Sequence, residues 1–300
     1  MNSIIADSEK KATASETQDL KEKLEEMVAT VDTGARNLHS WAGWILASVS
    51  LVWSLFQLWI ASPFPYMLAD IIPLLNSTHN RSAHLAFAIF LAFVAFPALK
   101  RSPRTKVPIQ DWIFALTGVS CALYIAVFSN ELADRPGLPI TQDLIFSGIG
   151  LVFLLEATRR ALGLPMMCVA LLFLSYVFFG EYAPDIIAWK GASFQKAMSH
   201  MWLSQEGVFG IGLGVSTGFI YLFVLFGALL EKAGAGNYFT QVAFALLGHY
   251  RGGPAKAAVV SSGMNGMISG SSIANVVITG TFTIPLMKKV GFTSEKAGAV

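Results

Sequence analysis

The sequence predicts an all-α integral membrane protein, a multi-span helical bundle that also contains a re-entrant helical hairpin. The first observation is composition: of 300 residues, 54% are hydrophobic and 13% charged, whereas soluble domains carry about 25% charged residues. The second is a series of six apolar segments, each long enough to cross a bilayer. The third is an uncharged stretch, 257–287, which is too long for a single crossing.

Residues 1–38 are polar and mixed in charge, and they predict a cytoplasmic N-terminal segment. Within this segment, five apolar residues recur at helical spacing: Leu20, Leu24, Met27, Val28 and Val31. Such spacing is typical of a short amphipathic helix that lies on the membrane or on a partner. A loosely ordered tail is the alternative interpretation.

The six predicted spans lie near 41–61, 83–99, 111–129, 142–158, 162–180 and 211–230. The loop at 100–106 holds four basic residues within seven positions, which places it in the cytoplasm by the positive-inside tendency. Counting outward from this loop puts the N-terminus in the cytoplasm as well. Arg159, Arg160 and Lys232 fall on the same side and agree with this topology.

The two long outward-facing connections, 62–82 and 181–205, are rich in apolar and aromatic residues, and we expect interfacial helices in both. A component boundary is predicted near residue 160. By that division, 39–160 forms a four-helix scaffold and 161–300 begins a glycine-rich component. In the second component, three glycines spaced by four residues would let another backbone approach one helix face: Gly210, Gly214 and Gly218.

The hairpin is predicted at 256–288 from length, polarity and charge. The 31 residues of 257–287 would span roughly 46 Å as one helix, against a hydrocarbon core of about 30 Å. The small polar residues at 269–272 favour turns and caps over helix interiors. Lys256 before the run and Lys288 after it stay on the cytoplasmic side only if the chain turns back.

The tip of this hairpin is the candidate site for substrate and ion. Where a helix breaks inside a membrane, freed carbonyls coordinate cations and exposed N–H groups attract anions. Neutral oxygens without thiol or imidazole suit Na⁺, which we place near Ser269, Ser271, Ser272 and Asn275. A turn between two ordinary helices, with serines as caps, is the alternative. The candidate substrate- and ion-binding residues are Ser269, Gly270, Ser271, Ser272, Asn275 and Thr279.

Several functional classes find no support in the sequence. Glu156 stands three and four positions before Arg159 and Arg160, so we expect local ion pairs rather than a proton relay. No hydrolase or ATP-binding motif occurs, which argues against an enzyme and a catalytic site. No cofactor is expected apart from a coupling ion, and no basic cluster interleaved with aromatics indicates nucleic acid.

Four stretches resemble one transporter family. They are EATRRALGLP at 156–165, EGVFG at 206–210, FVLFGALLE at 223–231 and above all GMISGSSIAN at 266–275. Over about residues 150–300 the chain resembles the fused permease of tripartite ATP-independent periplasmic (TRAP) transporters. The earlier spans, 40–158, are similar only in pattern to the four-helix small component of that family.

The resemblance implies a multi-pass secondary transporter of the bacterial inner membrane, with an elevator-type architecture. It implies import of small organic acids driven by a Na⁺ gradient, or by H⁺. The implied partner is a periplasmic solute-binding protein of the TAXI type. By this resemblance, Ser269, Gly270, Ser271, Ser272 and Asn275 form the tip of the first hairpin, near Na⁺ and the substrate carboxylate.

The family's large component contains two inverted repeats, each with a hairpin, whereas this sequence shows one. We therefore expect a truncated chain that holds the small component and much of the first repeat, without half of the site. A non-transporting membrane scaffold or sensor is the alternative function, and a passive channel is another. The substrate and the choice between Na⁺ and H⁺ are not determined by the sequence.

Overall fold

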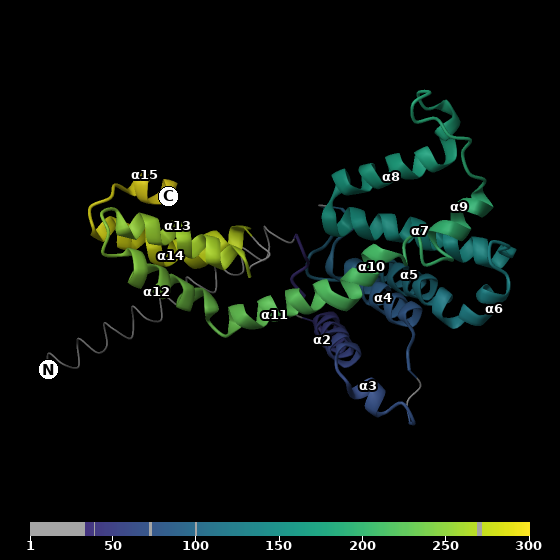
Figure 1. The fold of residues 1–300 in the computed structure, drawn as a ribbon, viewed down its shortest axis with the longest axis horizontal. Helices are drawn as coiled ribbons and strands as arrows, with labels where there is room; N and C mark the ends of the chain where they lie inside the picture. Colours follow the sequence, from purple (N-terminus) through teal and green to yellow (C-terminus); the bar gives the residue numbers. More distant parts are fainter. Residues whose placement is uncertain (1–33, 39, 72–73, 100, 269–271) are drawn as a thin grey trace. The chain divides into compact units, whose positions relative to one another are not determined.

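The computed structural model describes residues 34–38, 40–71, 74–99, 101–268 and 272–300. Throughout these residues the regular structure is helical, and the chain is an all-α membrane protein, as predicted. Residues 35–222 form one compact unit, and residues 223–300 belong to a second (Figure 1). The predicted amphipathic segment falls largely at 1–33, outside the described residues.

The unit at 35–222 contains most of the helices. In chain order they are α2 (Trp41–Ala61), α3 (Phe64–Met67), α4 (Ser77–Ala95), α5 (Ile109–Val127), α6 (Ser129–Asp134), α7 (Thr141–Leu162), α8 (Leu164–Phe179), η1 (Gly180–Tyr182), α9 (Phe194–Met201), α10 (Ile211–Val215), the π-helix η2 (Ser216–Ile220) and the first residues of α11 (Tyr221–Lys232). The second unit adds α12 (Ala235–Leu247), α13 (Gly253–Gly266), α14 (Ser272–Lys289) and α15 (Ser294–Ala299).

By length and composition, four helices of the described chain can cross a membrane: α2, α5, the stretch 164–182 and the stretch 211–232. The predicted spans 83–99 and 142–158 correspond to α4 and α7, which are 19 and 22 residues long but bury polar side chains. Helix α4 begins at Ser77, six residues earlier than expected, because the amide oxygen of Asn76 accepts from the backbone N–H of His79 at 3.0 Å. The first turn of α4 is polar, so a prediction from hydropathy alone does not include it in the helix.

The core of the unit at 35–222 lies where α4, α5 and α7 pack together. Phe93 and Trp202 are fully buried there, and the indole N–H of Trp202 donates to the carbonyl of Cys121 at 3.2 Å. A Cβ at Gly150 would stand 2.3 Å from the Trp202 ring, so this contact requires glycine. Close packing of this kind fixes how the helices of the unit meet.

The same unit contains a partly buried ion-pair network. The predicted pairs are confirmed, since Glu156 accepts from Nε of Arg159 at 2.7 Å and from Nε of Arg160 at 2.8 Å. Arg160 also reaches Asp111 at 2.8 Å, and the other oxygen of Asp111 binds Arg36. The network therefore joins the segment before α2 to α5 and α7.

The expected interfacial helices are short. The connection after α2 forms one turn, α3, and the connection after α8 forms the eight residues of α9. The intervening residues 183–193 are not helical. They are fixed instead by contacts such as the hydrogen bond from the Trp189 indole to the carbonyl of Tyr176, 3.0 Å long.

The glycine repeat at 210–218 does not form a continuous packing face. Gly210 precedes α10, and the π-helix η2 inserts a wider turn before Gly218. Only Gly214 has a close neighbour from another helix, because a Cβ there would stand 2.8 Å from the guanidinium of Arg81, whereas one at Gly218 would meet nothing within 4 Å. The three glycines therefore do not share one regular helix face, and a close backbone approach at this face stays a prediction.

Candidate functional site

The uncharged run forms two helices, α13 and α14, which pack against each other and lie side by side in Figure 1. Their helical limits place the break between Gly266 and Ser272, where the small polar residues occur. Ala258 early in α13 and Met287 late in α14 share one apolar cluster with Ala297. The two helices are therefore antiparallel, which brings their outer ends together. Entry into the membrane from the cytoplasmic side remains a prediction.

Local sequence explains where the first arm begins and ends. Gly252 precedes α13 with φ +72°, a left-handed conformation that favours glycine, and Pro254 occupies the first turn of the helix. At the other end, the N–H of Ile268 donates to the carbonyl of Asn265 at 3.1 Å. A Cβ at Gly227 of α11 would stand 2.8 Å from the carbonyl of Ile268, so α11 passes closely over this end of the arm.

The predicted site residues are only partly described. Ser269, Gly270 and Ser271 lie outside the described residues. Ser272 is the first residue of α14. Asn275 and Thr279 follow on the same helix, one and two turns further along.

Asn275 connects the two arms. Its Nδ2 donates to the backbone carbonyl and to the hydroxyl of Ser262 on α13, both at 3.1 Å. Its Oδ1 is buried and accepts no hydrogen bond from any described residue. Because the Nδ2 group donates to Ser262, Oδ1 is left as an oriented acceptor among the described residues.

Thr279 and Thr283 continue the polar side of α14. The Thr279 hydroxyl donates to the carbonyl of Asn275 at 2.7 Å, and the Thr283 hydroxyl donates to the carbonyl of Thr279 at 2.8 Å. Both side chains are buried. Their hydroxyl protons are used within the helix, whereas their oxygen lone pairs remain available as neutral acceptors.

Sequence reasoning missed three polar residues on α13. Ser262 orients Asn275, and Ser261 forms a 2.7 Å hydrogen bond with Thr240 of α12. Asn265 is 2% exposed, and neither of its amide atoms has a hydrogen-bond partner among the described residues. The sequence feature that could have indicated Asn265 is its isolated amide in a helix made mostly of apolar and small residues.

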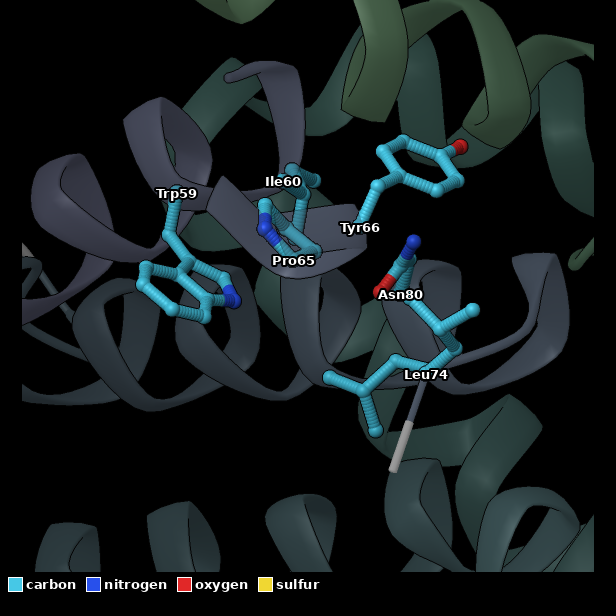
Figure 2. A pocket seen from close by; sticks show the side chains of 7 residues that line it. Trp59, Ile60, Pro65, Tyr66, Leu74 and Asn80 are labelled. Atoms are coloured by element: carbon cyan, nitrogen blue, oxygen red, sulfur yellow. The ribbon is translucent and has the colours of Figure 1, made fainter. Parts of the chain in front are cut away.

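The unit at 35–222 also contains clefts. One of about 70 Å³ lies between α2, the turn at α3 and the start of α4 (Figure 2). Figure 2 shows Trp59 at one side and Tyr66, Leu74 and Asn80 at the other. No lining residue carries a charge, so the cleft offers no electrostatic attraction for an anionic ligand.

Two larger clefts in this unit are more polar. One of about 200 Å³ includes Arg81, whose guanidinium donates to the carbonyl of Phe209 at 2.8 Å. Another of about 520 Å³ includes Lys196, His200 and Glu206. Neither cleft is lined by a residue of the hairpin.

Comparison with known protein families decides what kind of protein this is. Residues 149–300, just over half of the chain, match the family described as tripartite ATP-independent periplasmic transporter, DctM component. The chain belongs to the DctM family of TRAP transporters. This is a family of transporters rather than enzymes, and the match confirms the resemblance seen in the sequence. The matched range includes α13 and α14, so the hairpin belongs to the DctM region.

Individual relatives agree with the family assignment. The chain is 37% identical over 81 residues to the C4-dicarboxylate TRAP transporter large permease protein DctM of Vibrio cholerae, and 33% identical over 81 residues to the protein of that name from Rhodobacter capsulatus. It is 39% identical over 70 residues to an uncharacterized protein of Sinorhizobium fredii. Each DctM alignment covers 27% of this chain and only 18% of the relative's length. No solved structure gives a significant match.

Proposed function

We propose that this chain is the permease component of a binding-protein-dependent secondary transporter in the bacterial inner membrane, and that it imports organic acids. Membership of the TRAP family supports the transport role. The names of two relatives specify C4-dicarboxylates, which are organic acids. A periplasmic solute-binding protein, of the TAXI type, is the proposed partner.

The observation that carries the proposal is the buried Oδ1 of Asn275, which has no hydrogen-bond partner in the part of the hairpin that the structure describes. A buried acceptor that has lost its contact with water costs about 1–3 kcal/mol, so such a group in a native protein calls for an explanation. A cation bound against Oδ1 would remove this cost. The helical break beside it is the kind of place where transporters bind ions and substrates.

The chemistry of the donor set fits Na⁺. The sequence of 253–289 contains no aspartate, glutamate, histidine or cysteine, and neutral oxygens are what the arms offer at Asn275 and Thr279. Hard monovalent cations accept such oxygens, whereas a proton carrier needs a titratable group. We therefore favour Na⁺ over H⁺ as the coupling ion. A bound Na⁺ would supply positive charge that offsets the carboxylate of the cargo.

The start of α14 is the proposed position for that carboxylate. This helix is 18 residues long and begins at Ser272, where its first N–H groups have no partner within the helix. Such a terminus attracts anions. Asn275 stands one turn further along the same helix, so cation and carboxylate would bind next to each other.

Uptake measurements on Asn275→Leu test the proposal. The full-length permease and its binding protein are assayed in vesicles with an imposed Na⁺ gradient, with Ser175→Ala as the control because the Ser175 hydroxyl is exposed and bonded within its own helix. We expect Na⁺-driven uptake for the wild type and the control, and at least a tenfold loss for Asn275→Leu with normal membrane insertion. Undiminished uptake by Asn275→Leu would refute the assigned site, and gradient-independent leak of the cargo would indicate a passive channel instead.

A further inference from the structure

Arg81 has no carboxylate partner among the residues that the structure describes. It lies in the second turn of α4 and is half-buried. Its Nη1 donates to the carbonyl of Phe209 at 2.8 Å. Arg36 and Arg160 of the same unit, by contrast, both bind Asp111. An ionisable residue in a membrane helix is expensive, and its charge calls for a partner.

Arg81 lines the cleft of about 200 Å³ described above, which lies where three helices end or begin. Ala61 is the last residue of α2, Ser77 is the first residue of α4, and Gly214 belongs to α10. The guanidinium fits beside α10 because residue 214 is glycine, where a Cβ would stand 2.8 Å from Nη2. Since a water occupies about 30 Å³ in the liquid, the cleft has room for a phosphodiester group.

The chemistry of the lining favours an anion. The other polar lining residues, Ser77, Asn80 and Thr217, are neutral, and none of the residues given for the cleft is acidic. Asn80 also lines the smaller cleft, where Figure 2 shows its amide. The planar fork of an arginine matches two oxygens of a phosphate, and such bonds are charge-assisted. An ammonium group, by contrast, would find no counter-charge in this lining.

The position of the cleft favours a lipid as the source of that anion. Helix α2 and the stretch 211–232 can both cross a membrane, and the cleft lies at the end of the first and near the start of the second. Apolar side chains next to lining residues in the sequence are exposed: Leu58, Val215 and Phe219. A phospholipid holds its phosphate at the membrane boundary with its acyl chains against such a surface, and basic pockets between membrane helices bind lipid headgroups.

We propose that this cleft binds the headgroup phosphate of an anionic phospholipid, with Arg81 as its charged contact. Nη2 and Nε, the atoms nearest to Gly214, donate to the phosphate oxygens while Nη1 keeps its bond to Phe209. The bound lipid supplies the counter-charge that Arg81 lacks. Because it contacts the ends of α2, α4 and α10, it stabilises the folded unit by mass action. This site is separate from the hairpin and does not depend on the proposed transport function.

The test is the melting temperature of the purified full-length permease in detergent during titration with phosphatidylglycerol. Parallel titrations use phosphatidylethanolamine and inorganic phosphate. Arg81→Gln removes the charge, whereas Gly214→Ala keeps it and places a Cβ against the guanidinium. Arg101→Gln is the control for charge, because Arg101 is exposed. Gly212→Ala is the control for the glycine, because a Cβ there would meet nothing within 4 Å.

Phosphatidylglycerol should raise the melting temperature of the wild type and of both controls, with midpoints that agree within about twofold. For Arg81→Gln and Gly214→Ala we expect midpoints about tenfold higher, because a charge-assisted hydrogen bond is lost or displaced. Arg81→Gln also loses its bond to Phe209, which lowers the melting temperature without lipid but leaves the midpoint as an independent readout. Phosphatidylethanolamine should act at least about tenfold more weakly, and inorganic phosphate should have no effect.

Four results would overturn the inference. One is a phosphatidylglycerol midpoint for Arg81→Gln equal to that of Arg101→Gln. Another is equal stabilisation by inorganic phosphate, which would make the cleft a site for free anions. Equal stabilisation by phosphatidylethanolamine would contradict the preference for an anionic lipid. Finally, a wild type that phosphatidylglycerol does not stabilise, together with weaker uptake by Arg81→Gln in the presence of the binding protein, would assign Arg81 to an acidic segment of a protein partner.

Discussion

Asn275 of α14 and Ser262 of α13 tie the two arms of the hairpin together through a pair of 3.1 Å hydrogen bonds from one amide nitrogen. The contact has two consequences. It fixes the spacing of the arms next to their break, and it turns the oxygen of Asn275 away from Ser262. Asn275 therefore has a structural role in the hairpin, in addition to the ligand-binding role proposed for its oxygen.

Ser262→Ala should weaken the hairpin modestly. The variant removes the hydroxyl acceptor of Asn275 but keeps the backbone carbonyl, so we expect a loss of about 1 kcal/mol in the free energy of unfolding. The measurement is thermal denaturation of the purified protein in detergent. Ser175→Ala serves as the matched control, because its exposed hydroxyl bonds within its own helix. Equal melting of the two variants would show that the contact with Asn275 adds no stability.

Asp111→Asn should be much more damaging. Asp111 is 3% exposed and neutralises two guanidinium groups, those of Arg36 and Arg160. Removing its charge takes this counter-charge from the buried guanidinium of Arg36 and leaves Arg160 paired with Glu156, so we expect a loss of about 3–5 kcal/mol. Melting temperature and the yield of folded protein report the effect. Asp134→Asn, at an exposed position of α6, is the control, and similar stability of both variants would contradict the network's assigned role.

Gly150→Ala should distort the packing of α7 on Trp202. The added Cβ would stand 2.3 Å from the indole, and overpacking of this kind costs about 1–3 kcal/mol. Gly212→Ala provides the matched control, because a Cβ at that helical position would meet nothing within 4 Å. We expect a lower melting temperature and altered tryptophan fluorescence for Gly150→Ala only. The same loss in both variants would mean that helix propensity, not contact, decides the outcome.

Cysteine labelling from either side of the membrane tests the topology. In a background without Cys121 and Cys168, we expect Lys256→Cys and Lys288→Cys to react from the cytoplasmic side, as Arg104→Cys does. The physical reason is that α13 and α14 are antiparallel and therefore bring both lysines to the same end. Glu131→Cys, in α6, should react from the periplasm. Labelling of the two lysine positions from opposite sides would exclude a re-entrant hairpin.

The sequence was sufficient for the features that depend on length and charge. The break in the run at 257–287 follows from a helix that is too long, and the pairing of Glu156 with Arg159 and Arg160 follows from helical spacing. Both depend on residues close together in the chain. Interactions between residues close together in the chain are therefore enough to predict both features.

Features that arise from contacts between distant residues could not be predicted in this way. The π-helix η2 lies where the Nε2 of His84 meets the hydroxyl of Ser216 at 3.1 Å, and the Nδ1 of the same ring meets Gln57 at 2.5 Å. Nothing in 211–230 alone indicates these partners. Asn265 was missed for a related reason, because a lone amide in a helix shows neither its burial nor its lack of partners until the helices are packed.

Uptake by the full-length permease in reconstituted vesicles, with its binding protein and an imposed gradient of either Na⁺ or protons, tests the central claim most directly. The neutral oxygens of the hairpin and the absence of aspartate, glutamate, histidine and cysteine from the sequence 253–289 predict accumulation of an organic acid under the Na⁺ gradient. Accumulation under the proton gradient alone, or no accumulation under either gradient, would contradict it.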